Sequence, residues 1–370
     1  MKPFSPQLLP IPNIDWEGLM PLIGRANRAL ALYEGILLNS PNPEILLSPM
    51  TTQEAVLSSR IEGTQATLGE VLKFEAGDEP QQESKRQDIH EIINYRRALR
   101  RAEESLQTRP FNLNLLLELH SVLLDSVRGL NKGRGQFRRE QNWIGVSGSK
   151  LEEAQFVPPA PETIPGLLDN WEKYYHLERP DPLVQLSVLH AQFEVIHPFL
   201  DGNGRLGRLI VPLYLYEKKL LSRPMFYLSS YLEANREMYV ARLRALGRDE
   251  DAWTKWIEFF LVALTEQAVE NSSKTRQVLD LYEKLKGRII GLTHSQFAVP
   301  LLDRMFERPV FQISHIDSHP SMPSRPMLNG MVNKLKTDGI LEVVREGGGR
   351  RPQVLVLAEL VNLCEGREVL

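Results

Sequence analysis

The sequence predicts a mainly α-helical protein with one short β-hairpin near its middle and a winged helix-turn-helix at its C-terminal end. Three observations support this fold class. Apolar residues recur at spacings of three and four along most of the chain, as on one face of a helix. The stretch NWIGVSGSKLEEAQFVPPAP instead places β-forming residues on both sides of a polar turn. From about residue 280, three short helical patterns, at residues 295–306, 312–320 and 324–344, precede two strands around a glycine tip.

The bulk composition limits the class of protein. With 370 residues, 42% of them hydrophobic and 25% charged, we expect a globular chain of two or three domains. A net charge of -3 excludes a globally basic nucleic-acid binder but leaves a local basic face open. Cys364 is the only cysteine, which excludes an intrachain disulfide and a cysteine-rich zinc site. No signal peptide or membrane-spanning run is evident, so we expect a cytoplasmic protein with no membrane partner.

The first ~110 residues read as an N-terminal helical region. Several prolines in residues 1–18 predict an extended arm. The helical patterns that follow cover residues 22–38, 51–63, 84–106 and 113–127. The pattern over 51–63 opens with threonine caps and closes on Gly63, as helices often do.

Residues 111–270 form the predicted central domain. Its hairpin covers residues 142–158. The helical patterns after it cover residues 161–177, 181–196, 208–220, 231–246 and 251–289.

Residues 280–370 form the predicted winged-helix domain. They carry 12 Lys and Arg against 11 Asp and Glu, so the domain is nearly neutral. The tip between its strands, REGGGRRPQ, is basic and would suit contact with a DNA backbone. A solvated hairpin and a protein-docking domain are the alternatives at this stage.

The segment HPFLDGNGRLGR, residues 197–208, contains the G-x-G-x-x-G string of dinucleotide-binding proteins. A dinucleotide site needs a strand before the glycines, whereas residues 181–196 have the apolar spacing of a helix. A calcium loop fails because Arg205 and Pro212 stand where oxygen ligands are required. A tight helix–helix connection and an anion site remain.

Local physical chemistry favours the anion site. Pro198 disfavours helix at His197, so one helix ends there and the next can start near Gly204 with its N–H groups facing the loop. Such a loop before a helix N-terminus can cradle phosphate. Arg205 and Arg208 lie three residues apart on one helix face and can bind phosphate oxygens. Asp201 offers an oxygen ligand to Mg²⁺, and a histidine can accept a hydroxyl proton near neutral pH.

The segment resembles the motif of the Fic family, H-P-F-x-[DE]-G-N-G-R-x-x-R, at every specified position. GQFRREQNWIG and YLEANREMYVARL also look like Fic proteins, and the resemblance covers about residues 20–265. It implies a Fic-type helical bundle with a β flap. It also implies a nucleotidyltransferase that moves AMP from ATP to a Ser, Thr or Tyr hydroxyl of a target protein and of itself.

The resemblance assigns roles to individual residues. His197 would be the general base, Asp201 would hold Mg²⁺, and Arg208 would grip the γ-phosphate. Phe199 is expected to pack beneath the loop. The residues expected to bind the nucleotide are Gly202, Asn203, Gly204, Arg205, Leu206, Gly207, Arg208 and Tyr239. For Tyr239 the alternative is a helix-packing aromatic. The flap, at Ile144–Val157, would bind the target by strand addition.

SSRIEG, residues 58–63, resembles the inhibitory motif [ST]-x-x-x-E-[GN] of Fic proteins. Ser58 and Glu62 are four residues apart and share a helix face, which ends on Gly63. The resemblance implies that Glu62 pairs with Arg208 and occupies the place of the γ-phosphate.

Two further functions stay open. One is removal of AMP, or transfer of another phosphate-containing group, by the same fold. The other is a DNA-binding regulator that acts through residues 280–370. We expect ATP and Mg²⁺ as ligands, a docked target protein as partner, DNA or protein contact by the winged helix, and a homodimer as the family often forms.

Overall fold

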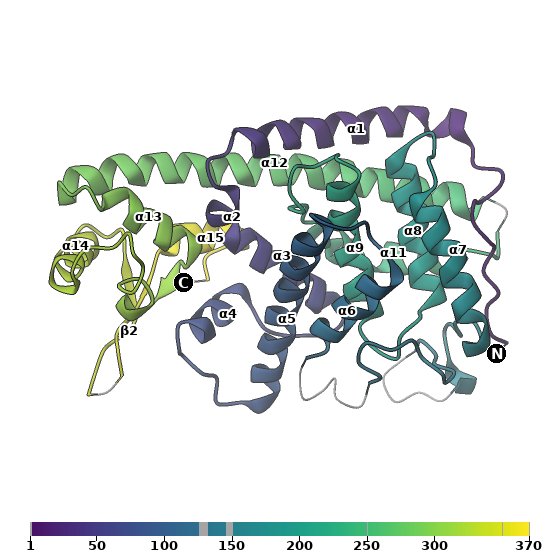
Figure 1. The fold of residues 1–370 in the computed structure, drawn as a ribbon, viewed down its shortest axis with the longest axis horizontal. Helices are drawn as coiled ribbons and strands as arrows, with labels where there is room; N and C mark the ends of the chain where they lie inside the picture. The colour runs from purple at the N-terminus through teal and green to yellow at the C-terminus, as the bar shows by residue number, and fades with distance from the viewer. Residues whose placement is uncertain (1, 126–131, 146–150, 250, 350, 370) are drawn as a thin grey trace. The chain divides into compact units, whose positions relative to one another are not determined.

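The computed structural model describes residues 2–125, 132–145, 151–249, 251–349 and 351–369, and its fold is mainly helical as predicted (Figure 1). The chain divides into two compact units. The first contains Met1–Glu34, Leu57–Gly63 and Asn94–Val269, and the second contains Gly35–Val56, Thr64–Ile93 and Glu270–Leu370. Four of the five boundaries between the units fall inside helices: α1 (Trp16–Asn39), α3 (Ser48–Ile61), α5 (Glu83–Leu106) and α12 (Ala252–Thr293). The fifth follows Gly63.

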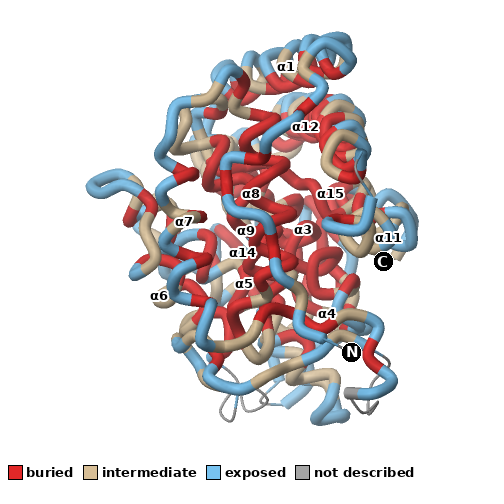
Figure 2. The backbone as a smooth tube through the Cα atoms, turned by 90° about the vertical axis from the view of Figure 1, so that its right-hand side faces the viewer, coloured by how far each residue is buried: buried red, intermediate tan, exposed pale blue. Residues whose placement is uncertain are grey.

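The first unit is built around helix α8. Its other complete helices are α6 (Leu113–Leu123), α7 (Ile164–His176), α9 (Asn203–Glu217), α10 (Ser229–Ala234) and α11 (Arg236–Ala245). Helix α8 (Pro182–Ile196) packs against α7 and α9, and all its residues from Leu183 to Ile196 are buried. Figure 2 shows α8 and α9 among the buried backbone. Contact on all sides explains why this helix is apolar around most of its circumference.

Both ends of α8 are defined by its sequence. At the start, Asp181 Oδ1 accepts hydrogen bonds from the N–H groups of Leu183 and Val184, each at 2.9 Å, and Asp181 Oδ2 accepts one from Asn27 Nδ2 at 2.8 Å. These bonds satisfy N–H groups that a helix leaves free. At the other end the helix stops one residue before the His197–Pro198 pair, as the proline predicts. The loop after α8 therefore starts from a fixed point.

The N-terminal arm has the expected extended form, since α1 begins at Trp16. Asn170 of α7 holds the arm by two hydrogen bonds: its Oδ1 accepts from the N–H of Leu9 (2.8 Å), and its Nδ2 donates to the Leu9 carbonyl (2.9 Å).

The pairing within the flap is shorter than the predicted hairpin. The described part has one antiparallel bridge, Ile144 with Phe156, and a 3-10 turn, η2 (Leu151–Glu153), while residues 146–150 lie outside it. The two prolines after Val157 have no N–H to extend the ladder.

The second unit contains a small antiparallel sheet with strand order β1-β3-β2. Its strands are β1 (Val310–Phe311), β2 (Glu342–Arg345) and β3 (Val354–Val356), and Val356 pairs with both Val310 and Glu342. Its complete helices are α2 (Pro43–Leu46), α4 (Leu68–Glu75), α13 (Ala298–Glu307), α14 (Arg325–Thr337) and α15 (Ala358–Glu365).

Strands β2 and β3 match the two predicted strands, whereas β1 and α15 were not predicted. The helix expected over residues 312–320 is wrong, because that segment holds only a 3-10 turn, η4 (Ile313–His315), followed by turns up to Pro320. The assignment of residues 280–370 to a winged helix stays a prediction.

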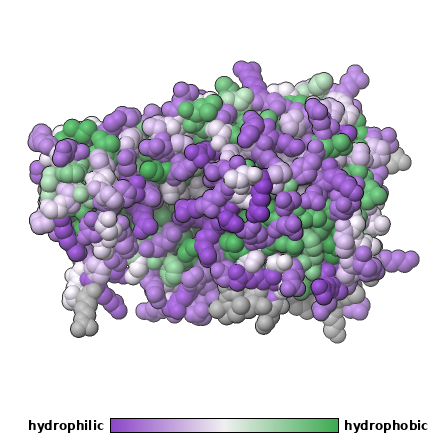
Figure 3. All heavy atoms as spheres, in the orientation of Figure 1, coloured by the Kyte–Doolittle hydropathy of each residue, from purple (hydrophilic) through white to green (hydrophobic). Residues whose placement is uncertain are grey.

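One face of the molecule carries mostly polar side chains (Figure 3). Figure 3 shows one face on which hydrophilic residues dominate and hydrophobic ones occur in small groups. Within the described residues, every helix is too short or too polar to span a bilayer.

Asp181→Ala should destabilise the first unit by about 1–2 kcal/mol, because it removes the cap of the central helix. Asp181→Asn is the matched control, since its amide oxygen can still cap. Urea unfolding followed by circular dichroism measures both. Equal stability of Asp181→Ala and wild type would show that the cap contributes nothing.

Candidate active site

The segment 197–208 forms the loop between α8 and α9 and the first turns of α9. His197 ends α8 in the left-handed region with φ 49°, and Gly202 precedes α9 with φ 79°. Gly202 adopts its conformation without strain. A histidine in the left-handed region is uncommon, so surrounding contacts must stabilise His197 there. Helix α9 starts at Asn203, close to the predicted Gly204. Its first N–H groups point out of the helix end as an anion site requires.

Arg138 holds the strained histidine in place. Its Nε donates to the His197 carbonyl at 2.9 Å, its Nη2 donates to the Pro159 carbonyl at 2.6 Å, and its backbone N–H donates to the Pro198 carbonyl at 2.9 Å. Arg138 is buried, and desolvation lowers the pKa of its guanidinium to about 10. This arginine joins the base of the flap to the loop. Arg138 lies in the segment GQFRREQNWIG, which resembles Fic proteins, but nothing in the sequence indicated a role for this residue.

Phe199 and His120 support the loop from below. Phe199 is fully buried, as expected, and its ring stacks on His120 with centroids 3.8 Å apart. His120 Nε2 donates to the Asp201 carbonyl at 3.0 Å, because a carbonyl can only accept, and His120 Nδ1 accepts from the N–H of Gly135 at 2.9 Å. Burial lowers the pKa of His120 to about 4, so the neutral ring keeps this orientation. Sequence reasoning missed this histidine as well.

The amide of Asn203 is also used to shape the loop. Its Oδ1 accepts from the Phe199 N–H at 2.9 Å, and its Nδ2 donates to the Phe199 carbonyl at 2.8 Å. Both side-chain groups are thereby engaged, and the backbone N–H is what Asn203 offers to a ligand.

The His197 ring has one nitrogen that can accept a proton. Its Nδ1 lies 3.3 Å from the Glu194 carbonyl, so the proton belongs on Nδ1 and the Nε2 lone pair is free to accept another. Burial lowers the pKa of His197 to about 4, although the Glu194 carbonyl and the charges of Glu62 and Asp201 oppose this. At neutral pH the ring is therefore uncharged.

Arg208 is buried on α9, with 1% of its side chain exposed, and three acceptors surround it. Its Nε donates to Ser58 Oγ at 2.9 Å, and its Nη2 donates to the Ser58 carbonyl at 2.8 Å and to Glu62 Oε1 at 2.6 Å. Desolvation works against the charged form, but Glu62, Tyr239 and Glu194 raise the pKa of Arg208. The guanidinium therefore stays charged, and its Nε and Nη2 are engaged by Ser58 and Glu62.

The Glu62 carboxylate lies over the first turn of α9. A Cβ at Gly204 would collide with Glu62 Oε1, so glycine is what permits this approach. Desolvation opposes ionisation of Glu62, yet Arg208, with smaller effects from Arg205 and His197, lowers its pKa. The carboxylate thus occupies the position that a bound anion would take at this helix N-terminus. Gly63, directly after it, has φ 105°, a conformation open to glycine.

Of the remaining predicted residues, Asp201 lies in the loop, whereas Arg205, Leu206 and Gly207 lie on α9. The Asp201 side chain is 42% exposed and lies 3.5 Å from Arg205 Nη2, which is itself buried. Leu206 is fully buried and packs in the core. Gly207 gives space to the Glu194 carboxyl, with which a side chain there would collide.

Tyr239 is buried on α11, and its hydroxyl lies 2.9 Å from His190 Nε2. Its ring packs against those of Trp256 and Phe259. It also lines the cavity next to the loop, so it is a packing aromatic that presents part of itself to that cavity.

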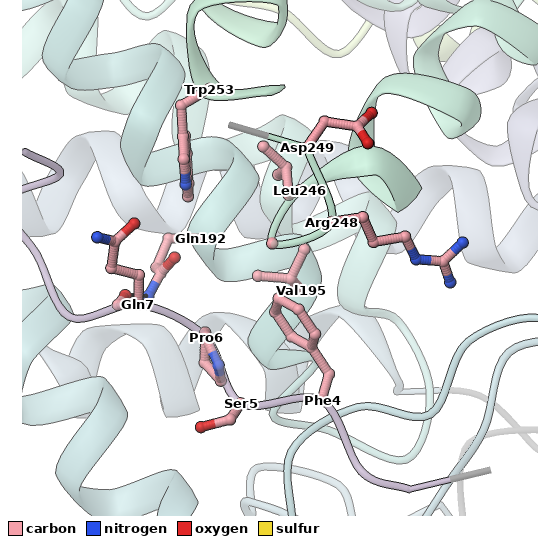
Figure 4. Close-up of a pocket in the computed structure, with 11 residues that line it drawn as sticks. Phe4, Ser5, Pro6, Gln7, Gln192, Val195, Leu246, Arg248, Asp249 and Trp253 are labelled. Carbon is pink, nitrogen blue, oxygen red and sulfur yellow. Dashed lines mark hydrogen bonds between the residues drawn. The ribbon is translucent and has the colours of Figure 1, made fainter. Parts of the chain in front are cut away.

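The cavity has a volume of about 360 Å³ and contains the predicted base and the ion pair. Its lining residues include Glu62, Glu194, His197, Gly204, Arg208, Tyr239, Ile144 and Phe156. A second cavity of about 350 Å³ lies between the N-terminal arm and residues 246–249, and has only Val195 in common with the first (Figure 4). There the Gln192 Nε2 donates to the Gln7 carbonyl at 2.9 Å and fastens the arm to α8. None of the predicted site residues lines this second cavity.

The fold and the site together define a helical protein in which a braced loop leads into the N-terminus of α9, beside the Arg208–Glu62 ion pair. Two family descriptions match the sequence: "Fic/DOC family N-terminal" over residues 20–104 and "Fic/DOC family" over residues 110–215. Together they cover more than half of the chain. The chain belongs to the Fic/DOC family, which confirms the resemblance.

Two curated relatives carry a named activity. The chain is 28% identical over 206 residues to a probable protein adenylyltransferase of Aquifex aeolicus, which covers 54% of this chain and 56% of the relative. It is 31% identical over 126 residues to the protein adenylyltransferase Fic of Drosophila grimshawi, covering 33% of this chain and 24% of the relative. The matched region thus spans about half the length of the first relative and a quarter of the second.

Solved structures share the fold. A Fic family protein from Desulfovibrio desulfuricans G20 superposes with a TM-score of 0.58 over 96% of this chain and 98% of that one, at 23% identity. A Fic domain-containing protein from Bacteroides thetaiotaomicron superposes with a TM-score of 0.55 over 69% and 96%, at 18% identity.

Glu62→Gln should destabilise the protein more at pH 7 than at pH 3. The pKa of Glu62 is lowered in the folded state, so its stabilising effect is present above the unfolded value of 4.5 and is lost as the pH falls through the folded pKa. Thermal unfolding of wild type and variant at both pH values measures the difference. The exposed Glu237→Gln is the control, and equal losses for Glu62→Gln at both pH values would contradict the ion pair.

Proposed function

We propose that this protein is an auto-inhibited protein adenylyltransferase that transfers AMP from ATP to Ser, Thr or Tyr hydroxyls of a target protein and of itself. One observation carries the proposal: the Glu62 carboxylate accepts a hydrogen bond from Arg208 and lies over the first turn of α9. An anion-binding position is filled there by an internal anion. The names of the curated relatives support the reaction class.

The triphosphate would lie along the N-terminus of α9. The N–H groups of this turn and the dipole of the helix favour negative charge. Arg205, beside the loop, and Arg208, deeper in the cavity, would bind its oxygens. Asp201 would hold Mg²⁺, which takes one or two carboxylates together with substrate phosphates. Its exposed carboxylate at the loop suits that ligand set, and Mg²⁺ would neutralise developing charge on the phosphates.

His197 would accept the proton of the attacking hydroxyl at Nε2. The hydroxyl oxygen forms a bond to the α-phosphorus, the bond between this phosphorus and the α–β bridging oxygen breaks, and pyrophosphate leaves. Because Nδ1 is hydrogen-bonded to a carbonyl, the lone pair of Nε2 is the one that faces the reaction. Arg138 fixes the backbone of this residue and hence the direction of the ring.

Glu62 would hold the enzyme in an inactive state. The Nη2 that donates to Glu62 and Ser58 is then not available to a γ-phosphate, so bound ATP lacks the contact between its γ-phosphate and Arg208. A buried guanidinium left without a partner is costly, so displacement of Glu62 needs a competing anion.

The flap would bind the target along its open side. Ile144 and Phe156 exchange two backbone hydrogen bonds, and neighbouring residues in a strand direct these groups to opposite edges. The Val157 carbonyl on the far edge accepts from the N–H of Phe4 at 2.9 Å. Because the N-terminal arm occupies that edge, a target strand would pair beside Gly145.

His197→Ala should reduce labelling of the protein by α-labelled ATP about 10²–10⁴-fold, because it removes the proton acceptor. Labelled ATP followed by gel autoradiography measures it. ATP binding by the variant is the control for an intact cradle. Full labelling by a variant that binds ATP would contradict the role of His197 as base.

Glu62→Gly should increase self-labelling at least about tenfold, because it frees Arg208 for the γ-phosphate. Glu62→Gln is expected to lie between Glu62→Gly and wild type, since it keeps the shape and loses the charge. The double variant Glu62→Gly/His197→Ala controls for non-enzymatic labelling. Unchanged labelling of Glu62→Gly would remove the inhibitory role of this carboxylate.

A further inference from the structure

Glu194 is a buried acidic residue that the proposed transfer does not use. It lies on α8, one turn before His197, with 9% of its surface exposed. It lines the same cavity as Glu62 and Arg208. Among the described residues, nothing hydrogen-bonds to its Oε1. A buried carboxyl oxygen without a partner needs an explanation, because the cost of desolvating it is not recovered elsewhere.

Gly207 is the residue that makes room for this carboxyl group. A Cβ at Gly207 would collide with Glu194 Oε1, so the carboxyl lies against the backbone of α9 directly before Arg208. The family motif leaves position 207 unspecified. Glycine at this position leaves the space that the Glu194 carboxyl group fills. Arg208 consequently has acidic residues near it from two elements, Glu62 after α3 and Glu194 on α8.

The other polar groups around Glu194 give its Oε1 no proton. His190 Nδ1 lies 3.2 Å from the Gly207 carbonyl and must carry the ring proton, so His190 Nε2 accepts from the Tyr239 hydroxyl at 2.9 Å. This Nε2 is 4.0 Å from Glu194 Oε1 and has no hydrogen to donate. Burial lowers the pKa of His190 to about 3, which keeps the ring neutral.

Arg208 is thus the cation that faces Glu194, and Glu62 is the competing anion. Burial raises the pKa of Glu194 to about 7, and Glu62 adds to this effect, whereas Arg208 acts against it. One guanidinium is matched by one negative charge when Glu62 is ionised and Glu194 is protonated. Two carboxylates on one guanidinium would leave an uncompensated buried charge.

We propose, on the basis of the function above, that Glu194 is a positioning residue that balances the charge of Arg208. It carries a proton while an anion, either Glu62 or a nucleotide phosphate, holds the guanidinium. It is ionised, and itself faces the guanidinium, when that anion is absent. Nucleotide binding to a site that lacks Glu62 therefore takes up one proton, and the affinity falls as the pH rises.

The test compares Glu62→Gly with Glu62→Gly/Glu194→Gln. The probe is α,β-methylene-ATP with saturating Mg²⁺, which cannot transfer AMP and whose phosphates stay ionised across the range. Titration calorimetry between pH 6 and 8, in two buffers of different ionisation enthalpy, gives the affinity and the proton uptake. With Glu194 present we expect uptake of about one proton at pH 6 that declines as the pH rises through about 7, and an affinity that falls up to about tenfold per pH unit below pH 7. The double variant should show none of this pH dependence, because an amide does not titrate in this range.

Equal proton uptake and parallel pH profiles in the two proteins would overturn this role of Glu194. Absence of nucleotide binding in both proteins at every pH would instead overturn the nucleotide site itself. Should Glu194→Gln not fold, infrared difference spectra of Glu62→Gly at pH 6 provide the second measurement. Nucleotide addition should then produce the carbonyl band of a protonated carboxyl group, and its absence would overturn the proposal.

Discussion

The site depends on one buried guanidinium. Arg208 is 1% exposed and directs its donors to Ser58 and Glu62 at the end of α3. A buried charge must be matched where it lies, so Arg208 determines what approaches the N-terminus of α9. Two features of the sequence serve this pairing. Ser58 and Glu62 are one helical turn apart, and Gly204 leaves space for the carboxylate.

Buried side chains hold the loop before α9 in one conformation. Arg138 fixes the backbone of the strained His197, and His120 supports the Asp201 carbonyl. These buried side chains donate to backbone carbonyls and leave the imidazole Nε2 and the N–H groups of α9 for a ligand. Rigid placement of base and cradle reduces the reorganisation needed during a transfer reaction.

Local signals in the sequence predicted the helices around the site well. The apolar spacing of residues 181–196 and the proline after His197 indicated the end of α8, and the glycines indicated the start of α9. The contacts that brace the loop were not predictable in this way. Arg138 meets the His197 carbonyl across 59 positions of the sequence, and neither residue carries a periodic signal for the other. Glu194 has no signal of its own within the apolar pattern of residues 181–196, and only the space at Gly207 distinguishes it. The predicted hairpin was more regular than the flap, because the prediction gave more weight to the β-forming residues than to the prolines beside them. Strand β1 was not predicted because two residues are too few to show an alternation of apolar and polar residues.

The central claim is that Glu62 and a γ-phosphate compete for Arg208. The most direct test measures the affinities of ATP and ADP, in their non-transferring α,β-methylene forms with Mg²⁺, for wild type and Glu62→Gly by titration calorimetry. If the claim is right, wild type binds the two nucleotides about equally, whereas Glu62→Gly prefers ATP by about tenfold or more, as one charge-assisted contact to a phosphate allows. The same ratio of affinities in both proteins would contradict it.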